Sequence, residues 1–198
     1  MSIYNINWVI NSSPVVSNID NCTLYENYII NTNSVDFNFL ARFFNELDLS
    51  AHITQPLPAQ DKVFENFFQI RNVHQHDPFK SLHDLINEQF NIDQINSDSD
   101  IFFSFVKGFH GITYENPYDV YLLNLHDELI YRVNDKNVHL KANDLLYIPM
   151  YTPHYCISIY PRITLSFGMR GDIERQFPWE LTTTTEIPFD LDNYTPLP

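Results

Sequence analysis

The stretch "DLLYIPMYTPHYCIS" (Asp144–Ser158) decides the fold predicted for this 198-residue chain. It begins as an apolar, β-prone run and passes through a turn flanked by Pro149 and Pro153. It then continues into a second β-prone run that begins at His154. A single histidine cannot hold a metal ion by itself. The pattern therefore raises the question of which other side chains reach His154.

From Ile101 onward the chain is a succession of short β-rich runs separated by Gly, Asn, Asp and Pro. These runs are "IFFSFVKGF", "ITYENPYDVYLLNL", "ELIYRV", "NVHLKANDLLYIP" and "HYCISIYPRITLSFGMR". Many short strands with closely spaced turns predict a jelly roll or another closed antiparallel barrel. We place this core barrel at residues 101–170, within a single domain that spans residues 1–198.

Residues 1–100 are expected to supply N-terminal strands and two helices that pack outside the barrel. "SVDFNFLARFFNELD" spaces aromatic and leucine side chains at helical intervals, with Ser34 as the expected N-cap. "DPFKSLHDLINEQF" predicts a second helix, with Asp77 as cap and Pro78 at the first helical position. "VFENFFQIRNV" reads as a strand, "NIDQINSDSD" as a loop, and the Pro-rich residues 171–198 as a surface tail.

Composition excludes several classes of partner. The chain has 25 acidic and 11 basic residues and a formal charge of -14, which repels phosphate backbones and anionic membrane surfaces. No apolar run is long enough to span a membrane, and the N-terminus does not read as a secretory signal. Two cysteines cannot form a disulfide framework. We therefore expect a cytoplasmic protein that binds neither nucleic acid nor membrane.

Four segments carry a resemblance to a known family. "PYDVYLLNL", "ELIYRV", "ANDLLYIPMYTPHYCIS" and "LSFGMR" occur in the order, and near the spacings, of the barrel of the JmjC-type oxygenases. This cupin-related family includes the ribosomal protein hydroxylases, and the resemblance covers about Phe103–Arg170. It implies a mainly β fold, a double-stranded β-helix of the cupin and JmjC type, with N-terminal helices packed outside.

The resemblance also implies an iron site, but this sequence departs from it. Family enzymes hold Fe(II) with a His-x-Asp/Glu pair and a distant histidine, and His154 matches the distant one. Tyr114 and Asn116 stand where the pair should be, and a phenol and a neutral amide are poor Fe(II) ligands. His110 lies four residues upstream of Tyr114, too far to substitute. We therefore predict a degenerate metal site with no cofactor, and His154 as the ligand if any metal binds.

The cosubstrate side departs from the family as well. In the ribosomal hydroxylase branch a basic residue pairs with 2-oxoglutarate, whereas the aligned positions Glu128–Ile130 are acidic or apolar. Lys107 or Arg132 could supply a positive charge from elsewhere. We place both cations, together with Asn116 and Tyr131, in the expected ligand-binding set.

The remaining candidates have ordinary structural explanations. His74 and His76 in "VHQHD" are interpreted as loop histidines before a helix, and Cys156 as a small core residue. Four other histidines are expected to be solvated: His52, His83, His126 and His139.

Three classes of function follow. The first is a JmjC-like barrel that binds a small molecule or peptide in its mouth, with oxygenase chemistry lost or replaced by metal-free acid–base chemistry of His154 and Tyr114. The second is an Fe(II)/2-oxoglutarate hydroxylase with unusual ligands. The third is a non-catalytic structural or partner-binding protein, such as a homodimer formed through the aromatic helices.

Overall fold

The computed structural model describes residues 6–30, 35–47, 67–92, 97–105, 108–109, 116–158 and 160–169. Within them neither helix is long and apolar enough to cross a membrane. The elements are β1 (Val15–Ile19), β2 (Cys22–Glu26), α1 (Phe37–Glu46), β3 (Phe67–Ile70), the 3-10 turn η4 (Val73–Gln75), α2 (Phe79–Phe90), β4 (Ser97–Ser104), β5 (Gly108–Phe109), β6 (Asp119–His126), β7 (Leu129–Val133), β8 (Lys136–Leu140), β9 (Leu145–Ile148), β10 (His154–Ser158) and β11 (Arg162–Met169).

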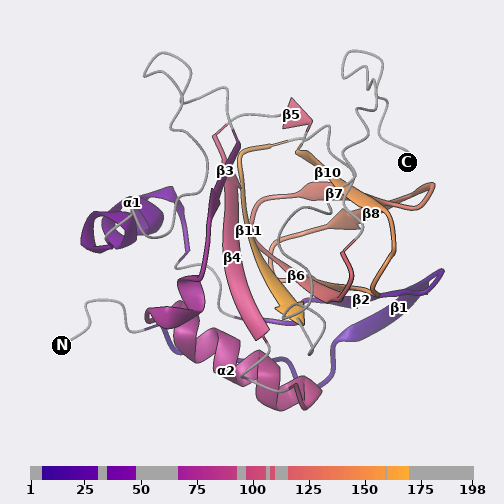
Figure 1. Cartoon of the computed structure of the whole chain (residues 1–198), viewed down its shortest axis with the longest axis horizontal. Coiled ribbons are helices and arrows are strands. Elements are labelled where there is room, and N and C mark those ends of the chain that lie inside the picture. Colours follow the sequence, from indigo (N-terminus) through magenta and orange to yellow (C-terminus); the bar gives the residue numbers. More distant parts are fainter. Residues whose placement is uncertain are drawn as a thin grey trace.

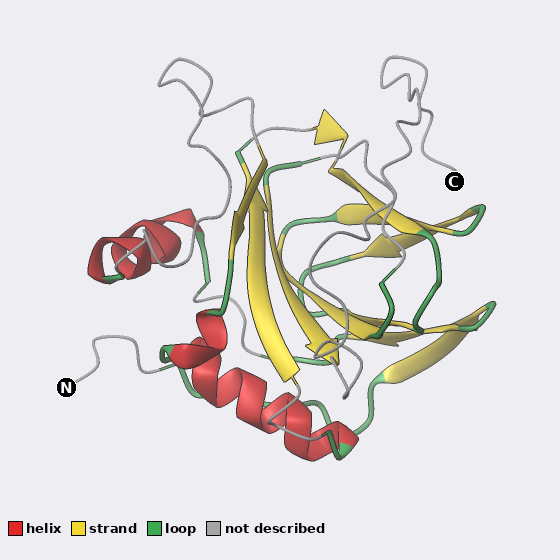
Figure 2. Ribbon diagram, viewed as in Figure 1, coloured by secondary structure: helices red, strands yellow, loops and turns green. Residues whose placement is uncertain are grey.

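The strands form two antiparallel sheets that face each other as a jelly roll (Figure 1). The larger sheet has the order β1-β2-β9-β6-β11-β4-β3, and the smaller has the order β5-β10-β7-β8. Both helices lie on the outer side of the larger sheet, away from the smaller one (Figure 2). The mainly β, cupin- and JmjC-like fold with helices outside is therefore confirmed.

Side-chain alternation divides the core into two clusters. On β6, Val120 and Leu122 point into the space between the sheets, while Tyr121 and Leu123 point outward to the helices. The inner cluster, between the sheets, is mostly aliphatic: Cys22, Leu24, Val120, Leu122, Leu129, Tyr131, Val133, Val138, Leu140, Leu146, Ile148 and Cys156. The outer cluster holds most of the buried aromatic rings. Because both faces of β6 are buried, its sequence reads as a nearly continuous apolar run.

The helix boundaries differ from the sequence prediction. α1 is capped by Asp36, whose Oδ1 accepts from the Phe39 amide at 2.7 Å, so Ser34 was the wrong N-cap. α2 begins one residue later than expected, with Pro78 as its N-cap and no side-chain cap. The Pro78 carbonyl accepts from the Trp8 indole at 2.8 Å and from the Ser81 hydroxyl at 2.7 Å. Pro78 thus occupies the N-cap position that was expected for Asp77.

Two strand predictions also need correction. The segment predicted as a loop over 91–100 includes the first half of β4, which begins at Ser97 and pairs along its whole length with β11. The N-terminal strands do not pack outside the barrel. β1 and β2 extend the larger sheet beyond β9, and β3 closes its other end beside β4.

Candidate functional site

His154 is the first residue of β10, where it pairs with Val133 of β7. It is buried, at 5% exposure, although the preceding turn exposes Met150 and Tyr151. The Tyr151 amide donates to the backbone carbonyl of Asn116 at 2.7 Å. This bond joins the backbone of Asn116 to the turn before His154, and the convergence of the Asn116 and His154 side chains remains a prediction. The segment that contains Asn116 is therefore hydrogen-bonded to the turn that precedes His154.

The immediate contacts of His154 fix its chemical form. Its Nδ1 lies 2.8 Å from the Thr152 carbonyl oxygen, which can only accept, so Nδ1 carries the proton. Burial lowers the pKa of His154, and the bond to Thr152 only partly opposes this effect. The ring is therefore neutral at pH 7, with Nε2 as its acceptor nitrogen.

Tyr131 and Cys156 lie beside His154 on the inner face of the smaller sheet. Cys156 is two residues after His154 on the same strand, so both side chains point inward, and it pairs directly with Tyr131 on β7. The ring centroids of Tyr131 and His154 are 6.4 Å apart. Tyr131 therefore lies near His154, its role in ligand binding remains a prediction, and Cys156 is a buried residue as expected.

Arg162 is the residue that sequence reasoning missed. It begins β11 on the larger sheet, is 2% exposed, and donates from Nη1 to the Cys156 sulfur on the smaller sheet. Burial acts to lower the pKa of Arg162, but its interactions with Cys156 and Tyr131 outweigh burial and raise it. The positively charged side chain of Arg162 therefore extends across the barrel interior, from the larger sheet to the smaller one. The signal in the sequence was a lone arginine at the start of the apolar run "RITLSFGM".

Buried hydroxyl groups surround the stem of Arg162. Ser104 on β4 is its direct cross-strand partner, and Thr164 follows two residues later on the same face. Thr164 in turn pairs with Asn124 of β6. Within the described residues, Ser104 Oγ, Thr164 Oγ1 and Asn124 Oδ1 are buried with no hydrogen-bond partner. Such atoms are rare in folded proteins because each leaves a desolvated polar group without compensation.

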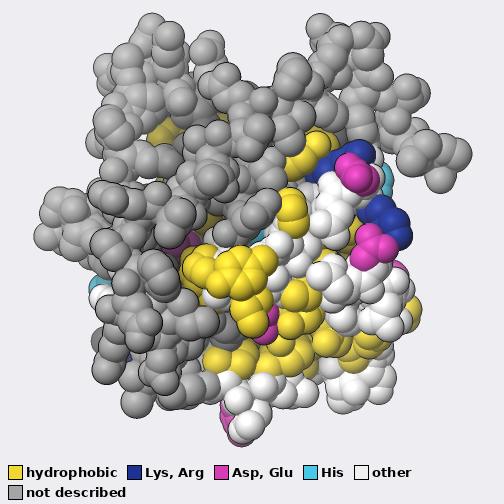
Figure 3. Space-filling model, turned by 45° about the vertical axis from the view of Figure 1, so that its right-hand side comes forward, with side chains coloured by type: hydrophobic (Ala, Val, Ile, Leu, Met, Phe, Trp, Pro, Cys, Tyr) yellow, Lys and Arg dark blue, Asp and Glu magenta, His cyan; other side chains and the backbone are white. Residues whose placement is uncertain are grey.

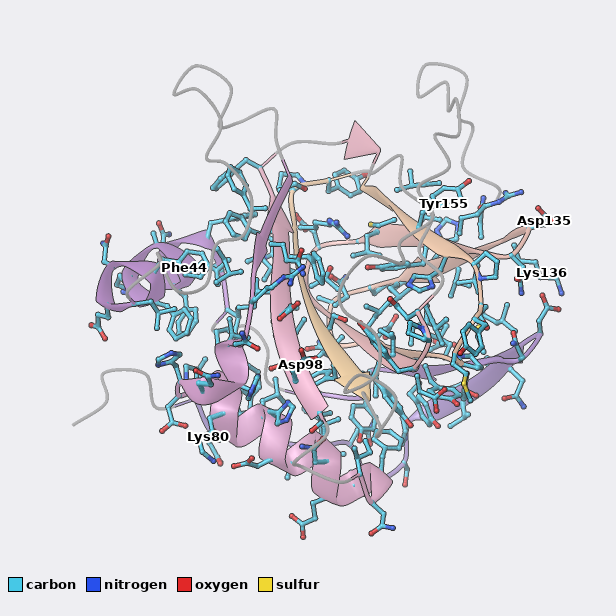
Figure 4. The ribbon with its side chains drawn as sticks, in the orientation of Figure 1. Phe44, Lys80, Asp98, Asp135, Lys136 and Tyr155 are labelled. Carbon is cyan, nitrogen blue, oxygen red and sulfur yellow. The ribbon has the colours of Figure 1, made fainter. Side chains whose placement is uncertain are left out.

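The other predicted cations are not inside the barrel as far as the structure describes them. Arg132 is next to Tyr131 on β7 and so points to the opposite face. Its guanidinium donates to Asn137 at 3.0 Å and lies 3.9 Å from Asp135, near the hairpin tip where Figure 4 labels Asp135. Placing Arg132 in the pocket was therefore wrong. Leu129 is buried in the inner cluster, and Lys107 lies outside the described residues.

The described residues do not fit an iron site. No group of three His, Cys, Asp or Glu side chains gathers anywhere in the described ranges. His154 alone offers a suitable nitrogen, while Tyr114 and His110 lie outside the described residues. The degenerate metal site, and the roles of Tyr114 and Asn116 in it, remain predictions.

The other histidines are mostly structural. His83 was predicted to be solvated, but it is 3% exposed and lies between α2 and the larger sheet. Its ring stacks on His74 at 5.0 Å, and His74 Nδ1 accepts from the Ser99 amide. His139 is exposed on β8, as predicted. His83 was missed because its neighbours on β4 lie in the segment read as a loop.

On the surface, apolar side chains are exposed between polar ones (Figure 3). They include Val15 and Val16 on the edge strand β1, together with Met150 and Tyr151 in the turn before His154. The turn thus lies at the rim of the barrel, and His154 lies just inside it.

Two facing antiparallel sheets, with a histidine at the rim turn and helices outside the larger sheet, define the JmjC- and cupin-type barrel. Comparison with solved structures agrees. The ribosomal oxygenase YcfD from Escherichia coli superimposes with a TM-score of 0.59 at 16% identity, covering 88% of this chain and 59% of that one. Its complex with cobalt and 2-oxoglutarate gives a TM-score of 0.60 at 18% identity, covering 89% and 59%.

The likeness at this level of identity establishes the fold. This chain matches 59% of the length of the ribosomal oxygenase, less than two thirds of it. No protein-family model matches the sequence, and no curated protein matches it significantly.

Proposed function

We propose that this chain is a JmjC-like barrel that binds a small molecule in its interior, where His154 provides metal-free acid–base chemistry. The observation that carries the proposal is the state of His154: buried, neutral, and oriented by the Thr152 carbonyl beside Tyr131. A fixed tautomer with an acceptor nitrogen toward the interior is the arrangement that a general base requires.

The chemistry assigned to each residue is simple. Nε2 of His154 takes a proton from the bound molecule, and the resulting imidazolium keeps its Nδ1 bond to Thr152. Because burial lowers the pKa of His154, the imidazolium returns the proton readily. The Tyr131 hydroxyl can donate to an oxygen of the bound molecule, which orients it against the imidazole. Tyr114 remains the second catalytic residue predicted from the sequence.

The distribution of aromatic side chains favours binding over a purely structural role. In the described residues, Tyr131 is the one buried aromatic ring of the inner cluster. The phenylalanines gather instead on the helix side of the larger sheet, around Phe79 and Phe103. The interior therefore combines aliphatic walls with a few polar groups, as small-molecule sites do.

The second candidate is an Fe(II)/2-oxoglutarate hydroxylase with unusual ligands. What favours it is the likeness of this fold to a ribosomal oxygenase whose solved complex contains cobalt and 2-oxoglutarate. The His154 tautomer would also suit a metal, because metal-bound histidines usually donate their other ring nitrogen to a carbonyl. Two further ligands would have to come from Tyr114 and Asn116 or from neighbouring residues.

Calorimetric titration with Mn(II) separates the two candidates. We expect wild-type protein to bind Mn(II) no more tightly than exposed histidines do, since one neutral imidazole does not compensate a desolvated dication. Tyr114→His with Asn116→Asp should raise the affinity by orders of magnitude, and His154→Ala in that background should remove the gain. Tight binding by wild type that His154→Ala abolishes, with succinate release from 2-oxoglutarate, would move the hydroxylase to first place.

The binding proposal has its own test. Side-chain ¹⁵N NMR of metal-stripped protein reports the His154 tautomer and any small molecule that reaches it. A library of small polar compounds should shift the His154 ring signals and leave those of exposed His139 unchanged. If no compound shifts His154, the interior is not a binding site and the third class, a structural protein, is favoured.

The remaining expectations complete the proposal. The bound partner is a small molecule or peptide, because the charge of -14 disfavours nucleic acid and anionic membranes. A cytoplasmic location and a homodimer remain predictions. For α1, the buried rings of Phe39 and Phe43 pack within the chain rather than presenting a surface for a second copy.

A further inference from the structure

Strand β1 lies at one end of the larger sheet, where it pairs with β2 and with no other strand of the described ranges (Figure 1). The strand carries no charged residue, and its Val15 and Val16 side chains are 63% and 53% exposed. Val16 pairs with Tyr25, which packs in the outer cluster, so Val16 faces the helix side and Val15 the opposite side. Apolar side chains therefore project from both faces of this edge strand.

The backbone of β1 has hydrogen-bonding groups that β2 does not use. The two strands form a hairpin with a two-residue turn, in which Ile19 pairs with Cys22. The residues that flank such a turn form a hydrogen-bonded pair, and bonded and non-bonded pairs alternate from there. The N–H and C=O groups of Val16 and Asn18 therefore point away from β2. These groups are a template for pairing with another strand.

The other strands at the ends of the two sheets lack this combination. The exposed residues of β8 are Lys136 and His139, and a lysine on an edge strand opposes pairing with another chain. Strands β3 and β5 have only four and two residues. Among the side chains that the structure describes on β3, β5 and β8, none is an exposed large hydrophobic residue. Only β1, of the described edges, combines unused backbone groups with exposed valines.

The charge of the chain limits where two copies can meet. A formal charge of -14 makes two copies repel each other over most of their surfaces. Next to β1 along the chain, Asp20 forms an ion pair with Lys136 of β8, which Figure 4 labels. Glu26 lies one strand further from the edge, on β2. The edge of β1 is therefore an uncharged stretch beside a neutralised carboxylate.

We propose that β1 pairs with β1 of a second copy of this chain, so that the larger sheets of two barrels form one continuous antiparallel sheet. The two copies are related by a two-fold axis, the commonest symmetry of soluble oligomers. The occupant is a second copy because the strand is complementary to itself. With Ser17 on the axis, Val16 of each copy pairs with Asn18 of the other, and Val15 lies beside Ile19 of the other.

The sequence of the strand favours this register over its neighbours. Centring the pair on Val16 would place Asn18 opposite Pro14, which has no N–H group to donate. Centring it on Asn18 would place Val16 opposite Asp20, where the backbone leaves the strand with φ 55°. Only the register centred on Ser17 gives every outward group of Val16 and Asn18 a partner. The interface is smaller than a standard one, so we expect a dissociation constant on the order of 10–100 µM.

Sedimentation velocity of the full chain tests the pairing. Between about 1 µM and about 500 µM, the protein should change from mostly monomer to mostly dimer. Val16→Lys introduces a charge at the edge, and Asn18→Pro removes an outward N–H group that β2 does not use. Each should weaken dimerisation by at least about tenfold. Tyr160→Lys makes the same change of net charge at an exposed position elsewhere and should leave the dimer unchanged.

A disulfide cross-link tests the register without disturbing the strand. In the proposed dimer Ser17 faces its own counterpart in a non-hydrogen-bonded pair, with Cα atoms about 4.5 Å apart, which suits a disulfide. Ser17→Cys protein should therefore form a covalent dimer when oxidised glutathione accepts the electrons of the two thiols. The control Val16→Cys should cross-link at least about tenfold more slowly, because Val16 faces Asn18. The native Cys22 and Cys156 are buried.

Several results would overturn the proposal. One is a protein that stays monomeric at about 500 µM, well above the expected dissociation constant. Another is a dimer that Val16→Lys and Asn18→Pro leave intact, or that Tyr160→Lys weakens equally, because the copies would then meet elsewhere. Should either edge variant fail to fold, equal cross-linking of Ser17→Cys and Val16→Cys would still count against the β1 pairing.

Discussion

Two buried polar clusters lie on opposite faces of the larger sheet, and they differ in charge. The cluster under α2 consists of His74, His83, Asn87 and Ser97, in which the Ser97 hydroxyl bonds to His83 at 3.0 Å and to Asn87 at 2.9 Å. Asn87 and Ser97 carry no charge, and burial lowers the pKa of His83 to about 4, so His83 is unprotonated at pH 7. Such a network joins a helix to a sheet, and within the described residues His83 Nδ1 and Asn87 Oδ1 are buried with no hydrogen-bond partner.

The cluster inside the barrel consists of His154, Tyr131, Cys156 and Arg162 and contains a permanent charge. Its members come from both sheets, and Arg162 connects the two. The contact between the two sheets at this point therefore involves a charged side chain, whereas the network under α2 joins one helix to one sheet. The comparison teaches that burial and hydrogen bonding alone do not mark a site.

The largest expected effect is a loss of stability caused by a substitution in the outer cluster, between the helices and the larger sheet. Phe79 is fully buried and contacts the rings of Phe43 at 5.0 Å, Phe39 at 6.0 Å and Trp8 at 6.4 Å. Phe79→Ala should lower the free energy of unfolding by about 3–5 kcal/mol, measured by urea denaturation. Tyr160→Ala, at an exposed position, should change it by less than about 0.5 kcal/mol.

The same variant also tests whether the two clusters are independent. Folded Phe79→Ala protein should still bind the small compounds that shift the His154 ring signals of the wild type, because Phe79 lies in the outer cluster, on the opposite face of the larger sheet from the barrel interior. Lost binding in a folded variant would show that the helix side controls the barrel interior, contrary to the comparison.

The second effect is a pH dependence of the folding stability, caused by His83 in the cluster under α2. Burial is the main cause that lowers the pKa of His83 from 6.5 to about 4, with a further contribution from His74. Because the unfolded chain binds the proton first, this stability is fully present above pH 6.5 and is lost as the pH falls toward 4. The loss should reach at most about 3 kcal/mol.

The measurement compares wild type with His83→Gln in urea denaturation between pH 7 and pH 4. The variant lacks the titrating group, so its stability should fall less steeply over this range. His139→Gln is the matched control and should keep the wild-type slope. Equal slopes for wild type and His83→Gln would show that His83 is already solvated, as the sequence had suggested.

Much of the fold could be predicted from local pattern. The strands after Ile101, both helices and the barrel class follow from alternation and helical spacing, which act within a few residues. The beginning of β4 was missed because "SDSD" is polar. Its serines face α2 and its aspartates face the barrel interior. Ser97 and Asp100 are buried, and each bonds to a side chain distant in sequence, Asn87 and Gln69 respectively.

The site was predictable only in part for the same reason. His154 follows from the turn that precedes it, and Tyr131 from its position in a β-prone run. Arg162 stands six residues after Cys156 and contacts it only because the two sheets face each other. The spacing of these residues along the sequence does not predict that contact. Arg132 was chosen instead, although its strand parity places it outside.

The smallest expected effect on stability concerns the N-cap of α1, for which the sequence predicted Ser34 and the structure has Asp36. Asp36 accepts the Phe39 amide at 2.7 Å, which satisfies one of the helix's unpaired N–H groups. Asp36→Ala should therefore cost about 1 kcal/mol of unfolding free energy, while Asp36→Asn, which keeps the acceptor, should cost only a few tenths. Ser34→Ala should have no measurable effect. If Ser34→Ala is the costly change and Asp36→Ala the neutral one, the helix begins as the sequence predicted. The His154 ring signals should be unchanged in all three variants, because α1 packs in the outer cluster, on the opposite face of the larger sheet from the barrel interior.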